Sequence, residues 1–249
     1  MMKETEALVS RVKKVNETHQ HLHLTVDESL LQIKAGQSVL VRPQTATLNP
    51  YLREQWFPVG ITKTALIMEL PLHYNVEPGR DVFSLMGLIG QPFKFRKTLR
   101  SVLLIAVDTA PTPLTMVIAP LLSNNVAVSL ILLGEATHYG TSHLPPEVEV
   151  LTGGEDLNWT NRVTSIGWAD QVFVCVPPGA EMPYFERIWT LFSELRSHID
   201  PNYLFGIFRP PLPCGTGACQ ACMLKKRGNK TLLLCEAGPA IDLSEVRFT

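Results

Sequence analysis

The stretch PCGTGACQAC, residues 213–222, holds three of the 5 cysteines of a 249-residue chain within nine positions. Gly, Thr, Ala and Gln separate these thiols, rather than the apolar residues that fill a core. A buried structural thiol behaves as a small hydrophobe and needs no second thiol beside it. This cysteine loop therefore indicates a segment wrapped around something that several sulfurs bind together, which is a metal, a metal cluster or a partner cysteine.

A fourth thiol follows at Cys235, so the gaps between the four candidate ligands are four, two and twelve residues long. The pattern Cys-x4-Cys-x2-Cys with a distant fourth cysteine is the plant-type spacing of a [2Fe–2S] cluster. Gly215 and Gly217 fit it, because backbone without a Cβ can fold closely onto an inorganic sulfide. The predicted ligands of one [2Fe–2S] cluster are Cys214, Cys219, Cys222 and Cys235.

Two other uses of these cysteines stay open. Structural zinc sites usually contain two short Cys-x-x-Cys pairs, and this sequence has one, from Cys219 to Cys222. Disulfides are rare in reducing compartments, and the N-terminal MMKETEALVSRVKK has no apolar signal core. We therefore expect a cytoplasmic protein with reduced thiols, and we keep a zinc-bound structural adaptor as the alternative.

The composition limits the kinds of partner. A net charge of −1 gives no electrostatic basis for binding nucleic acid. The most apolar segment, residues 101–122, contains Asp108 and three prolines, which break it into a strand and a short helix rather than a membrane span. A mean hydropathy of +0.11 is high for a free-standing chain, so we expect a partner to cover some apolar surface.

Strand patterns fill the N-terminal part, where short apolar runs are separated by turn residues. Such a series is typical of small barrels, so we predict a six-stranded β-barrel over residues 1–97. The expected strands are ALVSRVKKV, HLHLTV, QSVLVRP, WFPVGIT, TALIMELPL and DVFSLMGL.

The second of these strands carries a row of histidines. His19, His21 and His23 alternate with other residues, so on a strand the three imidazoles share one face and could bind a transition metal. No carboxylate or cysteine lies near them in sequence to complete a site. The favoured interpretation is therefore a solvated strand face.

From about residue 98 the pattern changes to apolar strand, helix, apolar strand, which predicts a nucleotide-domain-like α/β unit over residues 98–206. Thr112 and Pro113 offer an N-cap and a first-turn proline for an early helix. The segment EMPYFERIWTLFSEL, residues 181–195, has apolar residues at helical spacing and predicts a helix packed on the core. Cys175 lies inside the strand QVFVCV and is expected to be a packing residue rather than a ligand. The remaining residues, 207–249, are predicted to form the [2Fe–2S] cluster-binding domain.

With the cysteine loop in place, the chain resembles the electron-transfer subunit of the NAD-linked, two-subunit dihydroorotate dehydrogenases, in the ferredoxin–NADP reductase superfamily. The resemblance is closest over residues 214–246, in CG-x-GAC-x-AC, a basic hairpin, the fourth cysteine and a Gly-Pro tail ending in Glu-Val. More faintly, AGQSVLVRP and GLIGQPF resemble a barrel strand and the barrel-closing turn. The resemblance implies a barrel that binds FAD, an α/β domain that binds a nicotinamide nucleotide, and a cluster that passes electrons to a flavoprotein.

Several positions depart from that family. Its Arg-Pro-aromatic/aliphatic-Ser motif, which holds the flavin, is replaced here by Gln55-Trp56-Phe57-Pro58. Arg53 lies two positions early, which on a strand displaces its charge by about 6–7 Å. The family's Gly-x-Gly-Thr/Ser segment, which binds the FAD diphosphate at a helix N-terminus, is missing after LPLH.

The nucleotide loop departs as well. Where the family has a glycine-rich turn after the first α/β strand, this sequence reads Ala106-Val107-Asp108-Thr109-Ala110. Side chains occupy the space in which backbone would approach a diphosphate, and a carboxylate repels one. These departures argue against an FAD and against a nicotinamide nucleotide bound to this chain.

We therefore predict a β-barrel plus α/β fold of the ferredoxin reductase type, which carries one [2Fe–2S] cluster as an electron-transfer component rather than a stand-alone enzyme. The alternatives are a complete FAD and [2Fe–2S] subunit that takes electrons from NADH, and the non-redox zinc adaptor. The partner would be a redox flavoprotein or another oxidoreductase subunit in a hetero-oligomer. The residues expected to contact this partner flank the cysteines and are Phe205, Phe208, Arg209, Leu212, Met223 and Leu224. The alternative for Phe205 and Phe208 is that they fill the core between the α/β sheet and the loop.

Overall fold

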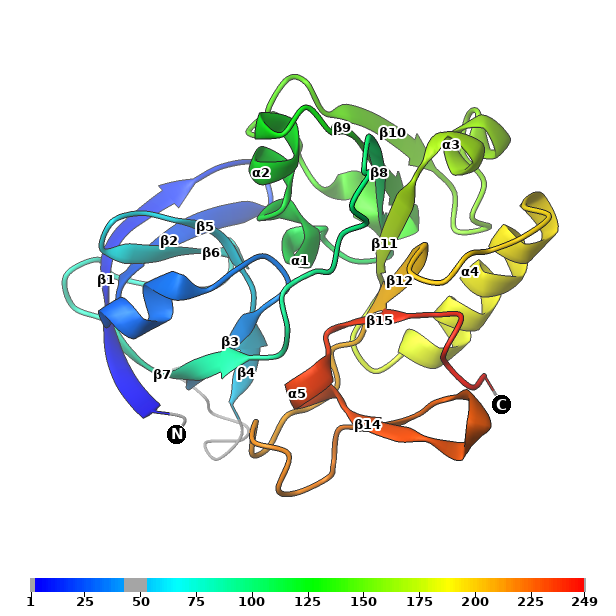
Figure 1. The fold of residues 1–249 in the computed structure, drawn as a ribbon. Coiled ribbons are helices and arrows are strands. Elements are labelled where there is room, and N and C mark those ends of the chain that lie inside the picture. Colours follow the sequence, from blue (N-terminus) through cyan, green and yellow to red (C-terminus); the bar gives the residue numbers. More distant parts are fainter. Residues whose placement is uncertain (1–2, 43–52, 249) are drawn as a thin grey trace.

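The computed structural model describes residues 3–42 and 53–248, in which a barrel lies beside an α/β layer with a small C-terminal unit below both (Figure 1). The barrel is one antiparallel sheet in the order β4-β3-β7-β1-β2-β6-β5. Its two outer strands, β4 and β5, are separated in the chain by Phe57 alone, so the sheet closes on itself. The elements are β1 (Lys3–Lys14), β2 (His19–Thr25), η1 (Glu28–Gln32), β3 (Ser38–Arg42), β4 (Glu54–Trp56), β5 (Pro58–Ile61), β6 (Ala65–Pro71) and β7 (Val82–Ile89).

The described residues of the barrel form seven strands where six were predicted. The expected strand WFPVGIT is divided, because β4 ends at Trp56 and β5 begins at Pro58. Proline has no backbone N–H to continue a ladder, so it stands at the first residue of a strand. The division lets the chain pass from one edge of the sheet to the other, and this step closes the barrel.

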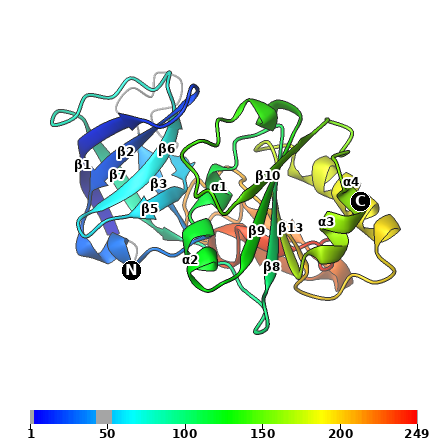
Figure 2. The ribbon, with the colours of Figure 1, turned by 90° about the horizontal axis from the view of Figure 1, so that it is seen from above.

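The α/β layer is a six-stranded sheet in the order β10-β9-β8-β11-β12-β15, parallel except for its last strand. Figure 2 shows α1 and α2 on the face toward the barrel, and α3 and α4 on the opposite face. The elements are β8 (Ser101–Val107), α1 (Thr112–Thr115), α2 (Ile118–Ser123), β9 (Ala127–Leu133), η2 (Gly134–His138), β10 (Glu149–Gly153), α3 (Arg162–Trp168), β11 (Gln171–Cys175), α4 (Glu181–Leu195) and β12 (Leu204–Ile207).

The near-continuous apolar strands are explained by this two-sided cover. Along β8, Val102 and Leu104 pack in one cluster with the residues of α1 and α2, while Leu103 packs in another with α3 and α4. The predicted helix over residues 181–195 is confirmed as α4, which buries Phe185, Ile188 and others of its stripe. Strand and helix patterns were therefore interpreted correctly where both faces of the sheet are covered.

The start of α1 differs from its prediction. Thr112 does not cap the helix: Pro111 occupies the N-cap position and no side chain makes a capping hydrogen bond. The Thr112 hydroxyl instead donates to Oε1 of Glu69 on β6, at 2.6 Å. A residue expected to act locally thus bonds across the boundary between the barrel and the α/β layer.

The C-terminal unit consists of a short hairpin, a helical turn and a strand that returns to the α/β sheet. β15 pairs antiparallel with β12, so part of the predicted 207–249 domain completes the sheet of the preceding one. Among the described residues, none of the helices is long and apolar enough to cross a membrane. The elements are β13 (Met223–Lys225), η3 (Arg227–Asn229), β14 (Thr231–Leu233), α5 (Leu234–Ala237) and β15 (Ala240–Asp242).

Candidate metal centre

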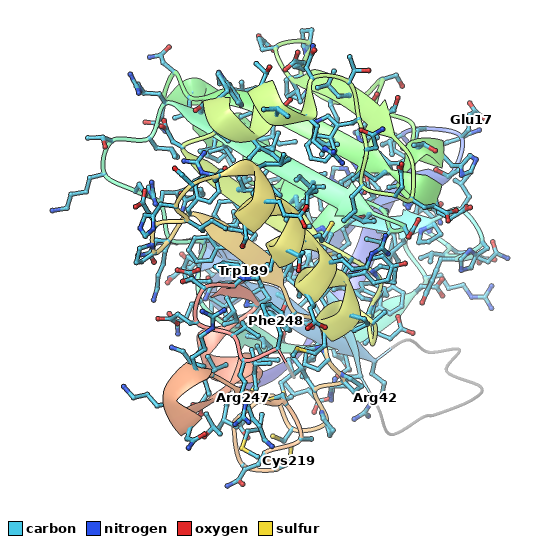
Figure 3. The ribbon with its side chains drawn as sticks, turned by 90° about the vertical axis from the view of Figure 1, so that its right-hand side faces the viewer. Glu17, Arg42, Trp189, Cys219, Arg247 and Phe248 are labelled. Atoms are coloured by element: carbon cyan, nitrogen blue, oxygen red, sulfur yellow. The ribbon has the colours of Figure 1, made fainter. Side chains whose placement is uncertain are left out.

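The four cysteines of the predicted set come from three places in the C-terminal unit. Cys214 and Cys219 lie in the cysteine loop, Cys222 immediately precedes β13, and Cys235 lies in the first turn of α5. The Leu234 N–H donates to the Cys222 carbonyl at 3.0 Å, which holds the start of β13 beside α5. Cys222 and Cys235 are buried, whereas Cys219 is exposed at the outer edge of the molecule (Figure 3).

Backbone N–H groups of the cysteine loop donate to two of the four sulfurs. The Gly217 N–H donates to Cys235 Sγ at 3.1 Å. The backbone N–H groups of Thr216 and Cys219 each donate to Cys214 Sγ at 3.4 Å. These donors lower the pKa of the Cys214 thiol to about 6, whereas burial raises that of Cys235 to about 12.

Glycines let the loop lie directly on its neighbours. Gly215 has φ +64°, and a Cβ there would lie 2.8 Å from a methyl of Leu40 on β3. Gly217 has φ +75°, and a Cβ would lie 2.3 Å from a carboxylate oxygen of Glu236. The Gly217 N–H instead donates to Cys235 Sγ at 3.1 Å. The loop therefore needs glycine both for its backbone angles and for its contacts with the barrel and α5.

The turn after β7 fixes the position of Cys235. The Gly90 N–H donates to the Cys235 carbonyl at 3.0 Å, and the Gln91 N–H to the Gly238 carbonyl at 2.6 Å. Gly90 has φ +78°, and a Cβ there would lie 2.5 Å from the Gly238 oxygen. The sequence showed a glycine turn at this place, but local patterns contain no sign that it holds a cysteine some 145 residues further on.

Most of the residues expected to contact a partner are instead core residues. Phe205, Phe208 and Leu212 are each at most 5% exposed. The Arg209 guanidinium donates to the Val176 carbonyl and to the Thr109 hydroxyl. Phe208, Leu212 and the buried Leu224 pack in the same core cluster as Cys222 and Cys235, whereas Phe205 stacks on Phe173 in the other cluster.

The exposed part of the site is the loop itself. Cys219 is exposed and Met223 is half exposed, at 50%. In the basic hairpin, Lys226 pairs with Glu245 at 2.5 Å and the Arg227 guanidinium lies over the Trp189 ring. A partner that approaches the cysteines therefore meets small polar residues of the loop, Met223 and the exposed Lys225, rather than an aromatic patch.

The residues at the expected flavin position bond within the chain. The Arg53 guanidinium donates to Glu4 Oε1 at 2.6 Å and to Ser84 Oγ at 3.0 Å, and its side chain is 7% exposed. Gln55 donates to the Ser38 hydroxyl at 2.8 Å, and Trp56 and Phe57 are buried. The Arg53 guanidinium and the Gln55 NH2 group therefore have protein partners, whereas the Gln55 Oε1 is buried without one among the described residues.

The turn that was expected to bind a nucleotide is likewise filled, in this case by the side chain of its own Asp108. Asp108 has φ 51°; its Oδ1 accepts from the Glu135 N–H at 3.0 Å, and its Oδ2 from the Tyr184 hydroxyl at 2.7 Å. This hydrogen bond raises the pKa of Tyr184. Ala106 and Val107 are buried at the end of β8, so the Asp108 carboxylate fills the turn between β8, η2 and α4.

Comparison with known proteins agrees with this geometry. The iron–sulfur cluster binding domain of dihydroorotate dehydrogenase B matches residues 212–247, which contain all four cysteines. No curated protein sequence matches the chain. The chain thus contains an iron–sulfur cluster binding domain of this type, and the resemblance to the electron-transfer subunit is confirmed over its C-terminal segment.

Solved structures show the fold of the whole chain. The structure of an NADH-dependent reduced ferredoxin–NADP oxidoreductase, described in a study of flavin-based electron bifurcation, superposes with TM-score 0.72 at 15% identity, over 97% of this chain and 90% of that one. The flavohaem-like FAD/NAD-binding domain of a nitric oxide dioxygenase from Vibrio cholerae O1 biovar El Tor gives 0.62 at 14%, over 83% and 99%. An Amycolatopsis cytochrome P450 reductase gives 0.62 at 17%, over 84% and 71%. The predicted ferredoxin reductase-like fold is confirmed.

The contact between Gly90 and α5 yields a first prediction. In Gly90→Ala, the new methyl collides with the Gly238 carbonyl and the left-handed backbone is strained, so α5 and Cys235 must shift. We expect the anaerobically purified variant to hold less than half the iron and acid-labile sulfide of the wild type.

Gly79→Ala is the matched control for this change. Gly79 has the same φ of +78°, but a Cβ there would meet no atom within 4 Å. The control should therefore retain its iron and sulfide despite the same backbone strain. Equal cluster content in the two variants would contradict the role given to the Gly90 contact.

Proposed function

We propose that this chain is an electron-transfer subunit that carries one [2Fe–2S] cluster and works inside a larger oxidoreductase, without a functional flavin or nicotinamide site of its own. The observation that carries this proposal is the match of residues 212–247, with all four cysteines, to an iron–sulfur cluster binding domain. The spacing Cys-x4-Cys-x2-Cys with a distant fourth cysteine suits a [2Fe–2S] cluster, whereas structural zinc sites usually contain two short Cys-x-x-Cys pairs.

The surroundings of the thiols also fit such a group. When bound, a [2Fe–2S] cluster supplies one-electron transfer. The N–H groups of Thr216, Gly217 and Cys219 would hold the negatively charged sulfurs, since hydrogen bonds to sulfur stabilise the thiolate form. Buried Cys222 and Cys235 would face the interior, while exposed Cys219 would offer the short route to a partner.

The absence of a flavin and of a nicotinamide nucleotide is supported by the groups that already occupy those places. Arg53 is the cation nearest the expected flavin motif, and Glu4 and Ser84 use its donors. The Asp108 carboxylate accepts two hydrogen bonds in the turn where a diphosphate would lie, and a second anion there would be repelled.

A complete subunit that binds FAD and oxidises NADH remains the second candidate. The fold favours it, because the superposition with an NADH-dependent oxidoreductase extends over 97% of this chain. Fold alone does not determine function, since one scaffold hosts several activities. The two candidates differ in a quantity that can be measured, the flavin content of the protein.

The ligand assignment predicts the behaviour of five single variants. Cys→Ser at positions 214, 219, 222 or 235 should remove or change the EPR signal of the reduced cluster, because an alkoxide or hydroxyl replaces a thiolate. Cys175→Ser should leave that signal unchanged, since Cys175 is buried within β11 and its Sγ lies 3.8 Å from the Ala110 carbonyl. The assignment is wrong if Cys175→Ser loses the cluster while Cys235→Ser keeps it.

The purified chain should contain iron and acid-labile sulfide with little flavin, and it should not reduce dyes with NADH. Calorimetry should detect no tight binding of NADH. Asp108→Gly tests whether the Asp108 carboxylate prevents the binding of NADH. The substitution removes this carboxylate, and glycine tolerates the φ of 51° at that position. Stoichiometric flavin or tight NADH binding by the unaltered chain would favour the complete subunit instead, and zinc without sulfide would favour the adaptor.

We propose that the exposed edge of the cysteine loop contacts a redox flavoprotein or another oxidoreductase subunit. Met223→Asp would place a charge beside this edge, so we expect it to reduce recovery of the partner when the tagged chain is isolated from its native host. Val163→Asp is the control, because Val163 is 62% exposed on α3, at the opposite end of the molecule from α5 (Figure 1). Isolation of the wild-type chain as a monomer with no redox subunit would contradict this contact.

A further inference from the structure

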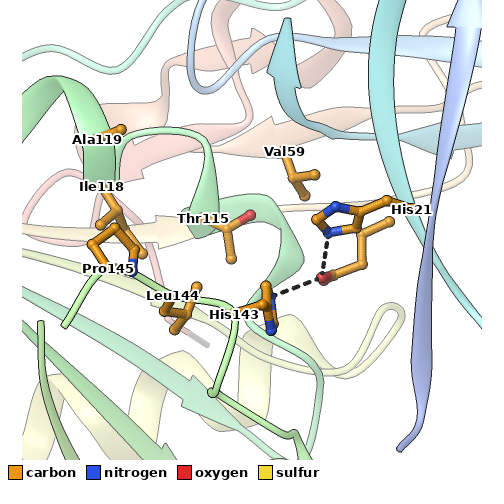
Figure 4. Close-up of a pocket in the computed structure, with 9 residues that line it drawn as sticks. His21, Val59, Thr115, Ile118, Ala119, His143, Leu144 and Pro145 are labelled. Atoms are coloured by element: carbon orange, nitrogen blue, oxygen red, sulfur yellow. Dashed lines mark hydrogen bonds and ion pairs between the residues drawn. The ribbon is translucent and has the colours of Figure 1, made fainter. Parts of the chain in front are cut away.

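A second group of metal-binding side chains lies where the barrel meets the α/β layer. His21 on β2 stands directly opposite Glu69 on β6 in the antiparallel ladder. His143 reaches the same place from the loop between η2 and β10. Nε2 of His21 lies 3.2 Å from Glu69 Oε2, and Nε2 of His143 lies 3.5 Å from the same oxygen (Figure 4).

The predicted solvated face is wrong for His21. Its side chain is 20% exposed, and that of Glu69 is 0% exposed. The carboxylate that the sequence lacked near the histidine row comes from a strand 48 residues further on, and the second imidazole comes from the α/β layer. One ligand atom of each of the three side chains lies within 4.8 Å of the other two.

A surrounding set of hydrogen bonds fixes the carboxylate. The Thr112 hydroxyl donates to Glu69 Oε1 at 2.6 Å, and the Tyr139 hydroxyl donates to Oε2 at 2.8 Å. The loop that carries His143 is itself held, because the Asn16 side chain donates to the Gly140 carbonyl at 2.8 Å. Such outer partners orient metal ligands, although Nδ1 of His143 is buried without a hydrogen-bond partner among the described residues.

Glu69 Oε2 has three polar neighbours, the Tyr139 hydroxyl and the Nε2 atoms of His21 and His143. The Tyr139 hydroxyl also lies 3.0 Å from Nε2 of His143. A neutral imidazole has one nitrogen with a free lone pair, so with both Nε2 lone pairs turned inward the two nitrogens and Glu69 Oε2 form a ligand set for a cation.

We propose that His21, Glu69 and His143 bind a divalent transition-metal ion, with zinc as the best match, and that the ion joins the barrel to the α/β layer. Zinc binds imidazole nitrogen and carboxylate oxygen at about 2.0–2.2 Å, which in a tetrahedron places ligand atoms about 3.3–3.5 Å apart. The two nitrogen–oxygen separations of 3.2 and 3.5 Å match that spacing.

The proposed ion keeps one open position. Beside the three ligands lies a cavity of about 150 Å³, which is otherwise lined by Val59, Thr115, Ile118, Ala119, Leu144 and Pro145. Three protein ligands with a free fourth position are typical of zinc sites that hold a water molecule or a small anion. Two neutral imidazoles and one carboxylate leave a net charge of +1 on the site, which favours hydroxide or an anion as the fourth ligand.

The test uses the cluster-loaded chain, purified anaerobically and treated with a mild chelator. Equilibrium dialysis at micromolar free zinc, with iron measured in the same samples, should give one zinc per chain without loss of iron. His21→Ala and His143→Ala should each bind zinc at least about 100-fold more weakly, while His23→Ala, on the same strand face, should bind it as the wild type does. Thr112→Val should keep the stoichiometry but weaken the affinity about 10-fold to 100-fold, because Thr112 orients Glu69 without touching the ion.

Thermal unfolding followed by calorimetry tests the joining role. Zinc should raise the unfolding midpoint of the wild type and of His23→Ala, and it should not raise that of His143→Ala. If His143→Ala is poorly folded, Glu69→Gln, which keeps the shape of the side chain, serves in its place. No zinc uptake by the wild type, or equal uptake by the ligand variants, would overturn the site and leave a metal-free hydrogen-bond cluster. Zinc uptake without a change in the midpoint would overturn the joining role.

Discussion

The contact between the Gly90–Gln91 turn and α5 connects all three parts of the molecule. Two backbone hydrogen bonds link the end of the last barrel strand to the Cys235 and Gly238 carbonyls. After Gly238 and Pro239 the chain enters β15, which completes the α/β sheet beside β12. The contact is possible because residue 90 has no Cβ, so the two backbones can approach to hydrogen-bonding distance. A change in the barrel turn is therefore transmitted to a cysteine and to the sheet edge together.

The charged groups at the expected flavin and nucleotide positions share one feature, which is that each is paired within the chain. Arg53 is paired with Glu4 and Ser84, and Asp108 accepts from the backbone of Glu135 and from Tyr184. A charge buried without a partner is costly, so a chain that does not bind a phosphate must supply such partners itself. The side chains that form these internal pairs are thus the same ones that argue against a flavin and a nicotinamide nucleotide in the proposed function.

Sequence patterns predicted the fold where the pattern is long and local. Helix α4 matches its predicted range of residues 181–195, because its apolar stripe repeats over several turns and packs on one face of the sheet. The cysteine spacing likewise located a domain that the family comparison confirms. Prediction failed where the structure depends on a single residue or on a distant partner. Pro58 divides one predicted strand into two. Phe208 and Arg209, residue types that are common in interfaces, instead point into the protein.

Long-range partners also explain why the histidine row was interpreted as a solvated face. No window around His21 contains Glu69 or His143, and only the strand register and the packing of the α/β layer bring them together. The barrel contacts the rest of the chain at several places, which include the Glu69–Thr112 hydrogen bond, the Gly90 turn beside α5 and the packing of Gly215 on Leu40. Each of these contacts joins residues far apart in the sequence, so no local pattern could have predicted it.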